Sequence, residues 1–134
     1  MKRLEINAEV SNLAAVSAFV DEQLEAADCS MKSQMQIDLA IEEIFVNIAS
    51  YAYAPGKGKA VISVDISEDR TASIIFEDSG VPYDPLAKED PDITLSAQER
   101  TVGGLGIFMV KKSMDDMKYE YSEGKNILTL VKKL

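Results

Sequence analysis

A carboxylate and an amide stand four residues apart on a predicted helix, as Glu43 and Asn47. Residues at this spacing are neighbours on one side of a helix. At about 100° per residue, both lie just off one edge of the apolar stripe, whereas Glu42 points nearly opposite, toward solvent. An amide oxygen can ligate Mg²⁺, and a carboxylate one turn away can orient or deprotonate a nucleophile. Taken alone, such a pair is more often a solvated helix edge, so its interpretation as a site depends on the other motifs.

A second candidate is the segment Asp78-Ser79-Gly80, which follows the apolar run of residues 73–76. The carboxylate of Asp78 is therefore expected at the end of a buried strand. An aspartate beside a glycine can accept a hydrogen bond from a flat ligand that comes close to the backbone. An ordinary Asp-Ser-Gly turn is the alternative.

A cluster of glycines, Gly103-Gly104-Leu105-Gly106, stands where a strongly apolar helix is predicted to begin. Glycine in a helix interior costs roughly 0.5–1 kcal/mol relative to alanine, so something should require the small size of Gly106. Free N–H groups at a helix start can bind phosphate, and tight helix packing would also require a glycine. The spacing matches neither the dinucleotide-binding motif nor the P-loop, so both interpretations stay open.

The composition excludes several classes of function. The chain contains no histidine, which excludes histidine acid–base catalysis, Ser–His triads, histidine metal sites and an autophosphorylated histidine. The 14 basic and 23 acidic residues give a net charge of −9, which disfavours a nucleic-acid binder and favours protein partners. Cys29 is the only cysteine, so a disulfide within the chain is excluded.

Length and hydropathy predict a single cytoplasmic domain. A chain of 134 residues can bury one core, and we expect residues 1–134 to form one domain. No apolar run approaches the roughly 20 residues of a membrane span. The first residues lack the apolar segment of a signal peptide.

Hydrophobic periodicity predicts the elements that position these motifs. Helices are expected from Ser11 as N-cap to about residue 27, from about residue 31 to about residue 53, and over residues 105–114. Ser30 or Ser33 is expected to cap the second helix. Its core stripe comprises Ile37, Ile41, Ile44, Ile48 and Tyr51. Strands are expected over residues 2–8, 60–67, 72–77, 118–122 and 126–132.

The order of these elements is strand, helix, helix, hairpin, loop, helix, hairpin, which excludes a doubly wound parallel sheet. We predict an α+β fold, a two-layer sandwich of a mostly antiparallel mixed sheet with helices on one face. The intervening residues 79–102 hold three of the four prolines. Loops of this length in compact domains are usually functional lids or disordered.

Taken in order, the motifs resemble the nucleotide-binding boxes of the GHKL (histidine kinase-like) ATPase superfamily. Glu43-x-x-x-Asn47 is similar to its N box, Asp78-x-Gly80 to its G1 box and Gly104-x-Gly106 to its G2 box. The closer match is the anti-sigma factor serine/threonine kinase branch, because residues 78–85 resemble its Asp-x-Gly-x-Pro-Phe-Asp-Pro. Residues 104–115 and 126–130 resemble its G2 helix and final strand.

The resemblance implies a Bergerat-type α/β sandwich that binds ATP and Mg²⁺. It implies that Asn47 ligates Mg²⁺ and that Glu43 is the catalytic base. Asp78 would accept a hydrogen bond from the adenine amino group, with Thr129 helping through water, and Gly80 would let adenine approach.

The resemblance also assigns the phosphate side of the site. Gly104, Leu105 and Gly106 would line the phosphates, residues 83–102 would form a lid, and Arg100 would be a further phosphate contact. Tyr51 occupies a position where the family often has histidine.

The function implied is that of an anti-sigma type regulatory kinase. It would bind a sigma factor or a comparable regulator, phosphorylate a serine or threonine of an antagonist protein, and form a homodimer. The alternative is a catalytically inactive module of the same fold that acts only by protein binding. An ATP-binding fragment of a histidine kinase is disfavoured by the absence of histidine and of a helical dimerisation region.

Overall fold

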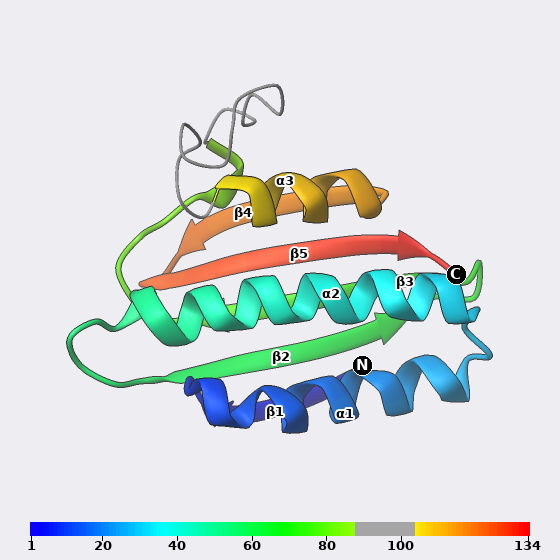
Figure 1. The fold of residues 1–134 in the computed structure, drawn as a ribbon, viewed down its shortest axis with the longest axis horizontal. Coiled ribbons are helices and arrows are strands. Elements are labelled where there is room, and N and C mark those ends of the chain that lie inside the picture. The colour runs from blue at the N-terminus through cyan, green and yellow to red at the C-terminus, as the bar shows by residue number, and fades with distance from the viewer. Residues whose placement is uncertain (88–103) are drawn as a thin grey trace.

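A single antiparallel sheet forms one layer of the protein (Figure 1). The computed structural model describes residues 1–87 and 104–134. The strands are β1 (Lys2–Asn7), β2 (Lys59–Ile66), β3 (Thr71–Asp78), β4 (Asp116–Ser122) and β5 (Lys125–Lys133). Their order is β1-β2-β3-β5-β4, and every pair of neighbours is antiparallel. The predicted α+β class is confirmed, and the described sheet is antiparallel throughout rather than mixed.

Three helices cover one face of this sheet (Figure 1). They are α1 (Leu13–Ala26), α2 (Met31–Asn47) and α3 (Gly104–Ser113), with short helical turns at Val10–Asn12, Ile48–Ala52 and Pro85–Ala87. The Ser30 side chain caps α2 by accepting a hydrogen bond from the Ser33 backbone N–H at 3.2 Å. Ser11 was predicted to cap α1, and this is wrong. It lies inside the turn before α1, and the N-cap residue is Asn12.

The core lies between the helices and the sheet, because strand side chains alternate between the two faces. Fully buried side chains from both layers meet there: Ile37, Ile41, Phe45, Ile62, Ile74, Phe76 and Leu130. Tyr51 was predicted to continue the α2 stripe, but its side chain is 68% exposed. The packed core ends at Ile48, and beside Tyr51 a cavity opens instead. Within the described residues, no helix has the length and apolar character needed to cross a membrane.

Two carboxylates, Asp21 of α1 and Asp38 of α2, interact with each other between these helices. Each has a buried Oδ1 atom to which no described residue donates a hydrogen bond. Burial first, then the hydrogen bond with Asp21 and the charges of Asp21 and Glu25, raise the pKa of Asp38 from 3.8 to about 7. A carboxyl group that takes up a proton here removes a like-charge repulsion between the helices.

Because the pKa of Asp38 is raised, we expect the free energy of unfolding to fall as the pH rises from about 4 to about 7. In that window the folded protein holds a proton on Asp38 that the unfolded chain has released. The stabilisation from this proton is complete below the pKa of the unfolded chain and is lost as the pH rises through the pKa of the folded protein. Asp38→Asn removes the titration. Relative to wild type, this variant should gain more unfolding free energy at about pH 8 than at about pH 5.

Urea unfolding at both pH values measures the difference. Asp65→Asn is the matched control, because Asp65 is exposed on β2. An Asp38→Asn effect that is the same at both pH values would contradict the raised pKa of Asp38.

Candidate functional site

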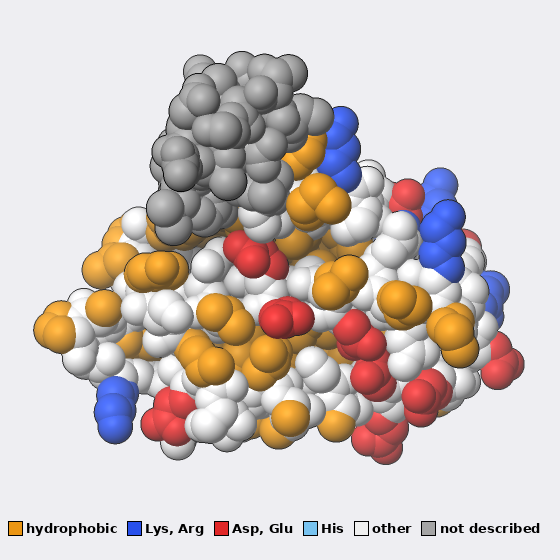
Figure 2. Space-filling model, viewed as in Figure 1, with side chains coloured by type: hydrophobic (Ala, Val, Ile, Leu, Met, Phe, Trp, Pro, Cys, Tyr) orange, Lys and Arg blue, Asp and Glu red, His pale blue; other side chains and the backbone are white. Residues whose placement is uncertain are grey.

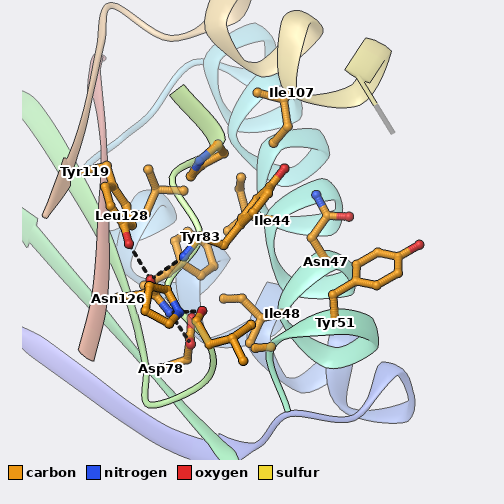
Figure 3. Close-up of a pocket in the computed structure, with 15 residues that line it drawn as sticks. Ile44, Asn47, Ile48, Tyr51, Asp78, Tyr83, Ile107, Tyr119, Asn126 and Leu128 are labelled. Carbon is orange, nitrogen blue, oxygen red and sulfur yellow. Dashed lines mark hydrogen bonds between the residues drawn. The ribbon is translucent and has the colours of Figure 1, made fainter. Parts of the chain in front are cut away.

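A cavity of about 460 Å³ opens between α2, the sheet and the segment that follows β3 (Figure 3). Most of its walls are apolar, and polar side chains occupy its floor and rim. Its lining residues are Ile44, Asn47, Ile48, Tyr51, Ala52, Phe76, Asp78, Val81, Pro82, Tyr83, Pro85, Ile107, Tyr119, Asn126 and Leu128. A mostly apolar cavity with a few convergent polar groups is the usual form of a small-molecule site.

The carboxylate of Asp78 lies on the cavity floor, at the last residue of β3, and is only 7% exposed. Its Oδ1 atom accepts two hydrogen bonds, from the Gly80 backbone N–H at 2.9 Å and from the Asn126 amide at 3.0 Å. None of the described residues donates to Oδ2. The carboxylate is therefore fixed through one oxygen, and the other is available to accept a hydrogen bond from a ligand.

The side chain of Asn126 links the polar groups on the floor of the cavity by hydrogen bonds (Figure 3). It is the cross-strand partner of Asp78 and is buried. Its amide nitrogen donates to Asp78 and to the Val81 carbonyl at 2.9 Å, and its oxygen accepts from the Tyr83 backbone N–H at 3.1 Å and from the Tyr119 hydroxyl. Two donors and two acceptors saturate an amide. Asn126 thus fixes Asp78 and the chain after it in one geometry.

Burial also acts on the tyrosine in this network. It raises the pKa of Tyr119 above its usual value, so the hydroxyl stays protonated at neutral pH and remains a donor to Asn126.

At the rim, Glu43 and Asn47 lie together on α2, as their spacing predicts. The Asn47 amide donates to Glu43 Oε1 at 3.4 Å, and both side chains are half-buried whereas Glu42 is exposed. Asn47 lines the cavity. A Cβ atom at Gly106 would stand 2.1 Å from the Glu43 carboxylate. The small size of Gly106 therefore allows α3 to pack on Glu43, which supports the packing interpretation of this glycine.

The small size of Gly80 has a structural explanation that differs from the predicted one. A Cβ atom there would lie 2.2 Å from the carbonyl oxygen of Ala52, the last residue of the helical turn Ile48–Ala52. The neighbouring Val81 N–H donates to the same carbonyl at 2.9 Å. This backbone contact explains why position 80 is a glycine. The predicted approach of adenine to Gly80 stays a prediction.

The structure does not bring Thr129 to Asp78. Thr129 pairs with Ile75 and Lys118. These two residues alternate with the cavity-facing residues of their strands, so Thr129 lies on the opposite face of the sheet. The predicted water-mediated role of Thr129 beside Asp78 is therefore wrong.

The remaining predicted residues lie toward the start of α3. Gly104 begins α3, and Leu105 and Gly106 follow in its first turn. Arg100 and residues 88–102 of the predicted lid lie outside the described residues.

Sequence reasoning missed Asn126, Tyr83 and Tyr119. A signal was present for Asn126, since it stands in register with Leu128 and Leu130 on the buried face of an alternating strand. A polar side chain at such a position must find partners. The two tyrosines carry no comparable signal in the sequence.

Comparisons with known proteins identify the family of this fold. Residues 6–132 match the histidine kinase-like ATPase domain family. The chain is 29% identical over 101 residues to the serine/threonine-protein kinase BtrW of Bordetella bronchiseptica, a match that covers 75% of this chain and 71% of BtrW. It is 32% identical over 94 residues to the serine-protein kinase RsbW of Bacillus cereus strain AH187, covering 67% of this chain and 58% of RsbW.

Solved structures support the same fold. The structure of the RsbU and RsbW domains of Rv1364c from Mycobacterium tuberculosis aligns with a TM-score of 0.69 at 19% identity, over 100% of this chain and 33% of that one. The histidine kinase domain of a blue-light activated histidine kinase from Erythrobacter litoralis aligns with a TM-score of 0.59 at 14% identity, over 91% of this chain and 61% of that one. The resemblance that the ordered motifs predicted is thus confirmed, and the chain belongs to the histidine kinase-like ATPase family.

Proposed function

We propose that this protein binds ATP with Mg²⁺ and transfers the γ-phosphoryl group to a serine or threonine of an antagonist protein. Its other partner is a sigma factor or a comparable regulator, so the output is regulation of transcription in the cytoplasm, and the working form is a homodimer. The observation that carries the proposal is the Asp78 carboxylate, held at one oxygen on the floor of an apolar cavity. The relatives named as serine or serine/threonine kinases support the choice of reaction.

The cavity floor and walls suit an adenine base. The exocyclic amino group of adenine is a donor. Asp78 Oδ2, to which no described residue donates, is an acceptor that matches it. The flat faces of the base fit between the apolar walls, which include Ile48, Phe76 and Leu128. A buried acceptor that needs a donor discriminates strongly against a base that lacks one.

The rim suits the phosphates and the reaction. Asn47 would ligate Mg²⁺ through its amide oxygen, and the ion would neutralise phosphate charge. Glu43 would accept the proton of the attacking hydroxyl as that oxygen bonds to the γ-phosphorus and the bond to the bridging oxygen of ADP breaks. Phosphoryl transfer relies mainly on positioning and charge neutralisation. The contact with Gly106 restricts the positions open to the Glu43 carboxylate.

Two measurements on the wild-type protein test the proposal. Calorimetry should show binding of ATP and ADP that requires Mg²⁺, with much weaker binding of GTP, which presents a carbonyl where adenine presents an amino group. Radiolabelled ATP should then transfer phosphate to a candidate antagonist. If the folded protein binds no ATP, the proposal fails. Binding without transfer would favour the inactive module instead.

A further inference from the structure

A second hollow, a groove of about 330 Å³, runs between α1 and α2 away from the nucleotide cavity. Its lining residues are Leu13, Ser17, Met35, Asp38, Leu39 and Glu42. On α2, these residues and those that line the cavity lie on opposite sides at 100° per residue. The groove is therefore a surface separate from the cavity, and an occupant of the groove would not contact the residues that line the cavity.

The α2 side of the groove is unusually apolar for an exposed helix face. Met31, Met35 and Leu39 follow one another at intervals of four residues and are 80%, 59% and 65% exposed. Four-residue intervals align side chains in a row along a helix, and this row extends over about 12 Å at 1.5 Å per residue. Methionine adapts its shape readily and is frequent at surfaces that bind amphipathic helices.

The charge of the groove is uniformly negative. Asp38 and Glu42 line it, and Asp21 and Glu25 of α1 act electrostatically on Asp38. None of the six lining residues is basic. Figure 2 shows acidic side chains gathered over α1 and α2 beside a row of hydrophobic ones. An occupant that fits has an apolar stripe and positive charges along its edges.

We propose that this groove, to which α2 contributes the apolar Met35 and Leu39 and the carboxylates of Asp38 and Glu42, binds a basic amphipathic helix of a partner protein. A second copy of this chain fits poorly, because each copy carries a net charge of −9 and would bring more negative charge to the groove. A partner helix with Leu or Met at positions i, i+3, i+4 and i+7 and Lys or Arg between them satisfies both features.

The test uses three synthetic 18-residue peptides and the full chain. The first carries leucines in one helical stripe and lysines elsewhere. The second has the same composition with the leucines dispersed, and the third replaces lysine by glutamate. The chain has only six methionines, so their ¹³C-labelled methyl groups report the binding position by NMR. We expect the first peptide to shift Met31 and Met35 but not Met109, which is exposed on α3.

Variants separate specific docking from general attraction to an acidic protein. The double variant Met35→Ser, Leu39→Ser should weaken the first peptide at least 10-fold, whereas the control Met109→Ser should leave its affinity within 2-fold. Asp38→Asn at about pH 8, where the carboxylate is charged, should weaken it several-fold, and the exposed control Asp65→Asn should not. Met35, Leu39 and Met109 are all exposed, so the protein should still fold when they are replaced by serine.

Three outcomes would overturn the proposal. Equal binding of the dispersed-leucine peptide would show that charge alone is recognised. An unchanged affinity of the first peptide for the Met35→Ser, Leu39→Ser variant would show that the peptide binds elsewhere on the protein. Methyl shifts of Met35 on simple concentration of the protein, with a rise in mass by light scattering, would assign the groove to a second copy. Loss of ATP binding would leave all three readouts unaffected, so the groove and the proposed kinase function can fail separately.

Discussion

Asp78→Asn is expected to weaken ATP binding by roughly 30- to 100-fold, which corresponds to about 2–3 kcal/mol. The reason lies in the geometry of the carboxylate. Its Oδ1 receives hydrogen bonds from Gly80 and Asn126, so an amide at position 78 must place its only oxygen there. Its NH₂ group then takes the place of Oδ2 and meets the amino group of adenine, donor against donor. Isothermal titration calorimetry with Mg²⁺ and ATP measures the change.

The matched control for this variant is Glu77→Gln. Glu77 precedes Asp78 on β3 and pairs with Ile127, so its side chain lies on the opposite face of the sheet. It should bind ATP like the wild type. A folded Asp78→Asn protein with unchanged affinity for ATP would show that Asp78 does not bind the adenine base.

The parts of the site that sequence predicted share a local origin. Glu43 and Asn47 are one helical turn apart, and the periodicity of one helix was enough to place them on one edge and Glu42 on the other. Asp78 was likewise expected at the end of a buried strand, because a short apolar run precedes it and a glycine-containing turn follows it. The strands and helices were predicted for the same reason, because their apolar patterns repeat over short distances.

The parts that were missed depend on contacts between distant segments. Asn126 meets Asp78 only because β5 pairs with β3 in one register across 48 residues of sequence. A shift of one residue would reverse the faces. Thr129 was assigned from the family resemblance alone, without a strand register, and it lies on the face away from Asp78. Gly80 and Gly106 were recognised as special, but what each one contacts, Ala52 and Glu43, is decided by how helices pack on other segments. The residue types indicate which chemistry is possible, but tertiary packing determines which of these residues are in contact.

Glu43→Ala is expected to lower the rate of phosphoryl transfer by roughly 100-fold or more, the usual contribution of a general base, while ATP affinity stays within a few-fold of wild type. The carboxylate is half-buried, receives the Asn47 amide at 3.4 Å and lies under Gly106 of α3. It does not line the cavity that would hold the base of the nucleotide. Its loss should therefore affect the reaction and spare binding. Single-turnover transfer from radiolabelled ATP gives the rate, and calorimetry gives the affinity.

The control is Glu42→Ala, which removes the same group one residue earlier on the exposed side of α2. Because Glu42 borders the α1–α2 groove, the antagonist must be saturating, so that a change in docking does not enter the measured rate. Under that condition Glu42→Ala should transfer phosphate at nearly the wild-type rate. Equal losses from both variants would mean that the charge of the helix matters rather than one positioned carboxylate. A fully active Glu43→Ala protein would place the proton acceptor elsewhere or show that transfer needs none.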